Sequence, residues 1–120
     1  MNELQITTRF AIHHGKLGEF KSLASRCLEV VREKDSGTLQ YDWFLNAAGT
    51  EFVLRERYRD SDAVLEHAMN LGDLMGRFMS ISVPDVEICG APSDSLLAAI
   101  AALQPRVYSA FQSIRDQGPG

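Results

Sequence analysis

Three histidines are the first candidates for chemistry in this sequence, because imidazole is the side chain that titrates closest to neutral pH. His13 and His14 are adjacent, so in an extended chain their rings point to opposite sides and one metal ion cannot bind both. No third ligand follows at a recognisable spacing, and we expect an exposed loop there without a metal. His67 lies in a helical pattern and is the candidate general base. The alternative is a structural histidine whose hydrogen bonds are satisfied.

Glu56 is the candidate partner of His67. By strand alternation Leu54, Glu56 and Tyr58 share one face. If that face meets the helices, Glu56 is a half-buried carboxylate, and such a group needs a partner. His67 or an arginine would serve. A structural ion pair with Arg9, or an exposed charge, is the alternative to a catalytic role.

Several reaction classes have no support in the sequence. A Gly-rich phosphate loop, a GxSxG elbow and an HExxH motif are all missing, which argues against hydride transfer, serine hydrolysis and zinc chemistry. Cys27 and Cys89 belong to no CxxC pair or metal spacing, and we expect both to be reduced core thiols. The sequence therefore predicts no metal and no bound cofactor.

The composition is that of one ordinary globular domain. The chain has 120 residues, of which 45% are hydrophobic and 23% charged, with a net charge of −4. No apolar run approaches the roughly 20 residues of a membrane span, and no dense basic stripe could neutralise a phosphate backbone. The start MNELQITTRF lacks the pattern of a secretory signal. We expect a cytoplasmic protein with neither nucleic acid nor membrane as a partner.

Hydrophobic periodicity predicts the elements that position His67 and Glu56. Alternation indicates strands at 4–12, 39–45, 52–58 and 82–89, the middle two joined as a hairpin. Helical spacing indicates helices at 17–34, from about 61 to 71, and at 73–80. With right-handed crossovers, the order β-α-β-β-α-β gives one antiparallel four-stranded sheet with helices on one face, the ferredoxin-like α+β arrangement.

Residues 91–120 are predicted to form a helical extension of the domain at 1–90. One apolar stripe runs along it, made of Leu96, Ile100, Leu103, Val107, Phe111 and Ile114. Pro105 removes a backbone donor inside this stripe, so we expect a kink or two abutting helices there. The extension is expected to pack on its own domain or on a dimer mate.

The sheet face without helices is predicted to carry Phe44, Val53 and Ala11 among polar residues. An apolar sheet face of this kind is commonly covered by a second copy of the chain. We therefore expect a homodimer.

Three segments in order, Asp35–Tyr41, Phe52–Asp60 and Ala63–His67, resemble the antibiotic biosynthesis monooxygenase (ABM) family. The family's pattern is a glycine-led strand with a tyrosine, a strand ending in aromatic-Glu-x-aromatic, and a helix bearing Ala-x-x-x-His. The resemblance covers about residues 4 to 89 and implies a dimeric α/β barrel of two ferredoxin-like subunits. Each subunit of such a barrel holds a substrate pocket between its sheet and its helices.

The resemblance also implies a site and an activity. The catalytic residues would be His67 and Glu56, and the substrate-binding side chains would be Thr8, Phe10, Tyr41, Trp43, Leu54, Tyr58 and Phe78. We expect a small cofactor-independent monooxygenase acting on a phenolic or quinol-like aromatic molecule. The alternatives are a non-oxidative, isomerase-like enzyme using the same pocket and a small-molecule-binding module without catalysis.

Overall fold

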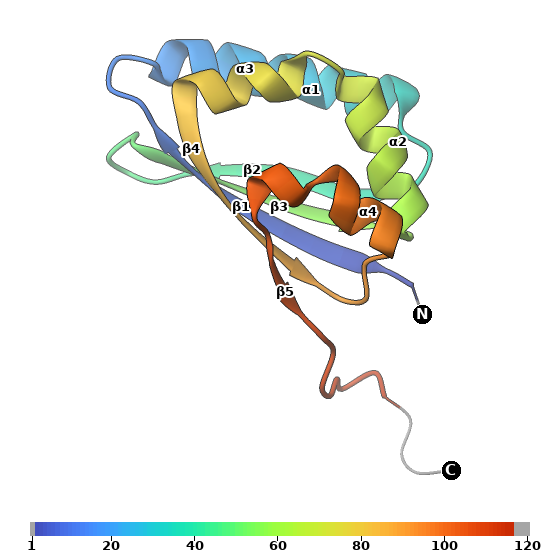
Figure 1. Ribbon diagram of the computed structural model, residues 1–120. Helices are drawn as coiled ribbons and strands as arrows, with labels where there is room; N and C mark the ends of the chain where they lie inside the picture. The colour runs from blue at the N-terminus through green and yellow to red at the C-terminus, as the bar shows by residue number, and fades with distance from the viewer. Residues whose placement is uncertain (1, 117–120) are drawn as a thin grey trace.

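A β-sheet forms one layer of the protein, and helices cover one of its faces (Figure 1). The computed structural model describes residues 2–116. The elements along the chain are β1 (Leu4–Ile12), α1 (Leu17–Lys34), β2 (Thr38–Leu45), β3 (Glu51–Tyr58), α2 (Ser61–Leu71), α3 (Leu74–Ile81), β4 (Ser82–Cys89), α4 (Asp94–Ala99), η1 (Ala101–Leu103) and β5 (Arg106–Tyr108). The order through β4 confirms the predicted ferredoxin-like α+β unit.

The strands lie in the order β2-β3-β1-β4-β5, with β1 in the centre. β1 runs antiparallel to both β3 and β4, and Thr8 lies opposite Leu54 on one side and Val86 on the other. β2 is antiparallel to β3 and places Trp43 beside Leu54. Since alternate residues face the same side, these four residues from four strands meet beneath the helices.

Strand alternation decides which side chains the helices cover. On β3 the buried residues are Phe52, Leu54, Glu56 and Tyr58. Two hydrophobic clusters result, one joining α1 and α3 to the sheet through Phe20 and Phe78, the other joining α2 and α4 to it through Val64 and Leu96. Removal of these apolar side chains from water is the main force that holds the layers together.

Two local signals fix the bounds of α2. The Asp60 carboxylate accepts a hydrogen bond from the Ala63 backbone N–H at 2.9 Å and so caps the first turn. At the other end, Gly72 has a φ of +52°, a conformation that glycine adopts readily and that lets the chain turn into α3. Between these ends, His67 falls on the buried face of the helix.

The predicted helix over the C-terminal apolar stripe is wrong beyond Leu103. α4 and η1 are helical and bury Leu96, but Gln104 takes a left-handed φ of +48°. Pro105 follows and has no N–H to continue a helical hydrogen-bond ladder. The chain instead forms β5, which pairs with β4 in parallel.

Three residues of the predicted stripe therefore do not lie on a helix. Val107, Phe111 and Ile114 are exposed, and Figure 1 shows the chain leaving the body after β5. Residues 117–120 of the predicted extension lie outside the described residues. Within residues 2–116, no helix combines the length and the hydropathy that a membrane crossing needs.

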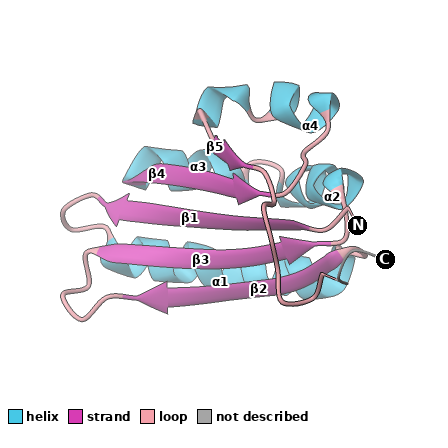
Figure 2. Cartoon of the chain, turned by 90° about the horizontal axis from the view of Figure 1, so that it is seen from below, coloured by secondary structure: helices cyan, strands magenta, loops and turns pink. Residues whose placement is uncertain are grey.

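The second face of the sheet carries no helix (Figure 2). Phe44 is 55% exposed and Val83 is 59% exposed on this side. Phe44 lies opposite Val53, and Val83 lies opposite Ala11. The three residues predicted for the open face therefore lie on it, and Val83 lies there too. We refer to Ala11, Phe44, Val53 and Val83 as the open-face patch.

Candidate active site

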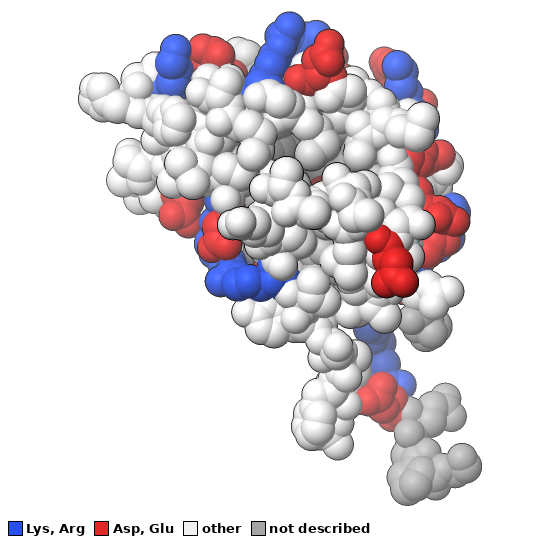
Figure 3. Space-filling view, in the orientation of Figure 1, with Lys and Arg blue, Asp and Glu red and all other residues white. Residues whose placement is uncertain are grey.

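A cavity of about 100 Å³ lies between the sheet and the helices. Its wall includes all but one of the predicted substrate-binding side chains, namely Thr8, Phe10, Tyr41, Trp43, Leu54 and Phe78, together with both predicted catalytic residues, His67 and Glu56. Figure 3 shows a hollow on this side of the molecule, surrounded by uncharged side chains. Tyr58 is the exception, because it is fully buried and does not line the cavity.

His67 is buried on α2 and held on two sides by aromatic rings. The ring centroids of Tyr41 and Tyr58 lie 5.3 Å and 5.4 Å from that of the imidazole. On a third side, Nδ1 of His67 lies 2.7 Å from Oδ2 of Asp35. The imidazole is therefore fixed in orientation as well as in place.

Asp35 is an ionised acceptor for this imidazole. Burial acts to raise the pKa of its carboxyl, but hydrogen bonds from Thr38, Asn70 and His67 outweigh that effect and hold the pKa below its usual value. Thr38 Oγ1 donates to Oδ2 at 2.6 Å and Asn70 Nδ2 donates to Oδ1 at 2.8 Å. Because a carboxylate only accepts, Nδ1 of His67 carries a proton and donates it in a hydrogen bond to Asp35, so Nε2 is the ring nitrogen that can exchange a proton with the cavity.

Sequence reasoning missed Asp35, which appeared only as the first residue of the segment Asp35–Tyr41 and was given no role. The available signal is on α2, where Asn70 follows His67 by three residues and so lies on the same helix face. Two hydrogen-bonding side chains on a buried face imply a shared polar partner on another element. They do not say which residue of the chain that partner is.

The turn that carries Asp35 packs closely against α2. A Cβ added at Gly37 would lie 2.5 Å from Cβ of Ala63, so only glycine allows this approach of backbone to helix. The Glu66 carboxylate accepts hydrogen bonds from the backbone N–H of Ser36 at 2.8 Å and from its hydroxyl. The Asp35–His67 distance therefore depends on contacts on both sides of the aspartate.

Glu56 is a buried carboxyl on the opposite side of the imidazole. Its Oε1 lies 3.7 Å from Nε2 of His67 and accepts a hydrogen bond from the Tyr58 hydroxyl. Burial raises the pKa of Glu56 and the charge of Asp35 adds to this, although His67 and the Tyr58 hydrogen bond oppose it. The carboxyl thus keeps its proton to higher pH than an exposed glutamate does.

The alternative ion pair between Glu56 and Arg9 is wrong. Arg9 lies on the other face of β1, where its guanidinium is 3.4 Å from Glu87. The strand alternation that turned Glu56 inward turned Arg9 outward. The His67 imidazole and the Glu56 carboxyl consequently face the same cavity, which has no arginine among its lining residues.

Polar groups other than this pair are few on the cavity wall. Thr8 is 5% exposed and brings a hydroxyl to it. The indole Nε1 of Trp43 is buried and has no hydrogen-bond partner among the described residues. An apolar wall with a few polar groups is typical of a site for a small molecule.

Other predicted features fall outside the cavity. His13 and His14 are exposed after β1, and residues 2–116 contain no cluster of three or more potential metal ligands. Cys27 is a buried free thiol whose pKa burial raises to about 12. Cys89 is free but exposed, so its prediction as a core thiol is wrong, because it lies on the outward face of β4.

Comparison with solved structures supports the fold. MupZ from Pseudomonas fluorescens is 21% identical with a TM-score of 0.83, over 100% of this chain and 99% of that chain. Rv0793 from Mycobacterium tuberculosis is 24% identical with a TM-score of 0.67, over 78% of this chain and 97% of that one. SnoaB, a cofactor-independent oxygenase from Streptomyces nogalater, is 18% identical with a TM-score of 0.64, over 78% and 96%.

The sequence itself matches a family model. No curated protein matches the chain, but the model of the family described as "Antibiotic biosynthesis monooxygenase" matches residues 4–70. The match spans β1 to α2 and includes Asp35, Glu56 and His67. The resemblance seen in the sequence is thereby confirmed: the chain belongs to the antibiotic biosynthesis monooxygenase family.

Proposed function

We propose that this protein is an enzyme that oxygenates a small phenolic or quinol-like molecule in the cavity without a bound cofactor. The observation that carries the proposal is His67, whose Nδ1 is held by Asp35 while the ring lies on an apolar cavity wall. A general base fixed in this way can take a proton from a phenol. Membership of the family, and the likeness to an oxygenase described as cofactor-independent, support the same reaction class.

In the proposed reaction, Nε2 of His67 accepts the phenolic proton and leaves an electron-rich phenolate. The phenolate carbon para to the oxygen transfers electrons to dioxygen and forms a C–O bond, which gives a hydroperoxide after protonation. Loss of the proton from that carbon and cleavage of the O–O bond leave a quinone and release water. Phenol and one O₂ thus give quinone and one H₂O, with dioxygen as the only oxidant.

The other groups of the site have distinct parts in this scheme. Asp35 keeps the proton of His67 on Nδ1 and stabilises the imidazolium that forms. Glu56, with its raised pKa, can supply the proton that the peroxide needs. The mostly apolar wall presents few competing polar groups to the phenolate.

A second candidate is a non-oxidative, isomerase-like reaction. The observation that favours it is the 3.7 Å between His67 Nε2 and Glu56 Oε1, because a base beside a protonated acid can move a proton from one atom of a substrate to another. In that reaction His67 removes a proton, Glu56 donates one, and no electrons leave the substrate. Oxygen would then have no role.

An oxygen electrode separates these possibilities. A panel of phenols and hydroquinones is incubated with the protein in air and under argon, and products are analysed by mass spectrometry with ¹⁸O₂. Oxygen uptake with incorporation of ¹⁸O, lost in His67→Ala, supports the oxygenase. Conversion that proceeds equally under argon favours the isomerase-like reaction, and saturable binding without conversion favours a non-catalytic binding module.

We also propose that the protein forms a homodimer through the open face of the sheet. The open-face patch offers apolar side chains to a second copy, and Phe44 and Val83 are more than half exposed. A patch of this kind is costly to leave in water. Light scattering should give about twice the 13.3 kDa of one chain.

A further inference from the structure

We propose that the C-terminal segment 94–103 is the specificity element of the cavity, and that Ile100 and Leu103 confine it to uncharged molecules of one ring. This inference rests on the proposed function in one respect, since it takes the cavity to be the binding site. Beyond the proposed function, it identifies the part of the chain that selects the substrate and the size of the substrate.

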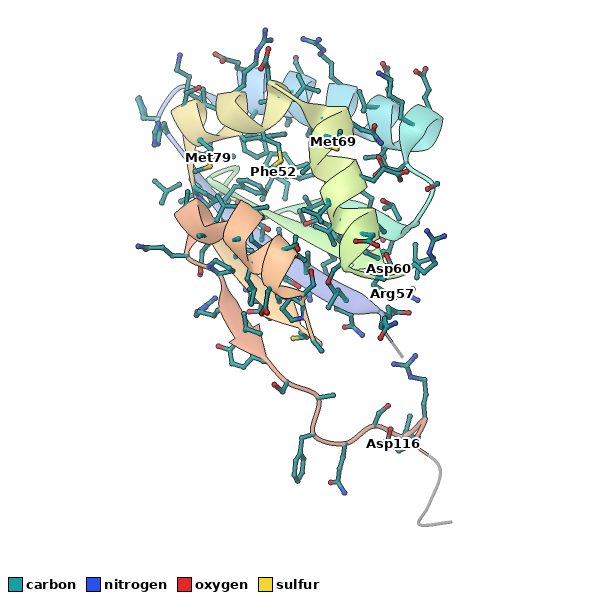
Figure 4. All side chains as sticks on the ribbon, turned by 45° about the vertical axis from the view of Figure 1, so that its right-hand side comes forward. Phe52, Arg57, Asp60, Met69, Met79 and Asp116 are labelled. Atoms are coloured by element: carbon teal, nitrogen blue, oxygen red, sulfur yellow. The ribbon has the colours of Figure 1, made fainter. Side chains whose placement is uncertain are left out.

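Ile100 and Leu103 are the part of the cavity wall that lies outside the ferredoxin-like unit. Both line the cavity together with Met75 and Met79 of α3 and Pro84 of β4. Figure 4 shows Met79 between α3 and the C-terminal helical segment. This segment therefore forms one wall of the cavity, next to α3 and β4.

The comparisons with solved structures are consistent with a cavity wall that is added to the ferredoxin-like unit. A stretch amounting to 78% of this chain covers 97% of Rv0793 and 96% of SnoaB, whereas MupZ is matched along its full length. The two shorter relatives thus lack a counterpart to about a fifth of this chain. The ferredoxin-like unit is complete at Cys89, so the elements after β4 are the part of the fold that can differ.

The segment is anchored at both ends and so behaves as a wall rather than a lid. At its start the Ser93 side chain caps α4 by accepting from the Leu96 backbone N–H, while the Ser93 N–H donates to Ser61 Oγ at the start of α2. Leu96 is fully buried. At its end, after Gln104 and Pro105, β5 pairs with β4.

The size and charge of the cavity indicate what fits. At about 100 Å³ it is smaller than sites for drug-sized molecules, which begin near 300 Å³, and closer to cavities of roughly 150 Å³ that hold benzene. No lysine or arginine is among its lining residues, while Glu56 is. A carboxylate or phosphate on the substrate would meet no lysine or arginine here, so the cavity wall favours an uncharged ring.

The test compares the binding of two probes, phenol and 2-naphthol, by NMR titration. Wild type is compared with Ile100→Ala and Leu103→Ala, and Leu97→Ala is the matched control because Leu97 lies on α4 but does not line the cavity. We expect wild type and Leu97→Ala to prefer phenol. Ile100→Ala and Leu103→Ala should shift the ratio of the two dissociation constants by at least about tenfold toward 2-naphthol, the lower end of the range for one methylene group in an apolar pocket.

Two results overturn the inference, and they differ in what they imply for the proposed function. If the probes bind but the ratio is the same in all four proteins, the wall does not select by size, while the site and its chemistry stand. If neither probe binds any of the proteins, the cavity is not a site for phenols, and both proposals fail. The melting temperature of each variant shows whether it is folded. If an alanine variant does not fold, Ile100→Val or Leu103→Val is tested in its place.

Discussion

The imidazole of His67 and the carboxylate of Asp35 form a pair, with Nδ1 of His67 2.7 Å from Oδ2 of Asp35. The two residues are 32 positions apart in the chain and meet because the turn before β2 packs against α2. The pair fixes which nitrogen of the imidazole is basic. The proposed activity would therefore depend on a turn that does not line the cavity.

Removal of either partner should lower turnover more than it lowers substrate binding. His67→Ala should reduce kcat by about 10²- to 10⁴-fold, the usual contribution of a positioned base. Asp35→Asn should reduce it by up to about 10⁴-fold, because the amide carries no charge to stabilise the imidazolium and no longer holds the proton on Nδ1. Steady-state kinetics on a substrate found in the oxygen-uptake panel measures both, and KM should change by only a few fold.

External imidazole provides the control for this prediction. It should partly restore turnover in His67→Ala, where it can enter the space of the missing ring, and should not do so in Asp35→Asn. A folded His67→Ala protein with full activity would remove this histidine from the mechanism. The substrate would then lose its proton without a catalytic base, because burial raises the pKa of Tyr41 far above its usual value and keeps its hydroxyl protonated.

Glu56 should make the stability of the protein fall as pH rises. Its pKa is raised in the folded protein above the usual 4.5, so between these two values the folded state holds a proton that the unfolded state has released. Stability therefore decreases with rising pH across this window and levels above the folded pKa. Glu56→Gln keeps an oxygen that accepts from Tyr58 and should lose this pH dependence.

Urea denaturation at a series of pH values measures the difference between wild type and Glu56→Gln. The stability advantage of the variant should be smallest below pH 4.5 and should grow as pH increases. Glu51→Gln is the matched control, because this glutamate is on the same strand and only half-buried. An advantage that does not change with pH would show that Glu56 ionises in the fold as freely as it does in the unfolded chain.

The sequence predicted which face of a strand a side chain lies on better than it predicted which residues that side chain contacts. Alternation along β3 put Glu56 on one face with Leu54 and Tyr58 but did not say whether helices cover that face; the structure shows that this face is buried. The family pattern put His67 on a helix facing the sheet. Asp35 escaped notice because its role depends on a long-range approach of a turn to a helix, which no local period records. The prediction of a helix along the whole C-terminal stripe was wrong for a related reason. The apolar spacing fits a helix, but Gln104 and Pro105 end the helix, and the edge of β4 is free to pair with the chain that follows.

Gly37 should be irreplaceable in the turn that carries Asp35. Gly37→Ala would put a Cβ 2.5 Å from that of Ala63, so the turn must move away from α2. We expect a loss of about 1–3 kcal/mol in the free energy of unfolding and a fall in kcat like that of Asp35→Asn. Gly18→Ala is the control, since a Cβ there meets nothing within 4 Å and alanine favours the helix. Equal stability of the two variants in urea denaturation would contradict the close packing.

A charge in the open-face patch should separate the proposed dimer. Val83→Glu places a carboxylate beside Ala11, on the face without helices and away from the cavity. Burying two such unpaired carboxylates, one from each copy, would cost several kcal/mol, so light scattering at micromolar concentration should give one chain mass instead of two. Glu33→Gln, an exposed position on α1, is the control and should remain dimeric. A Val83→Glu protein that stays dimeric would place the interface elsewhere on the surface.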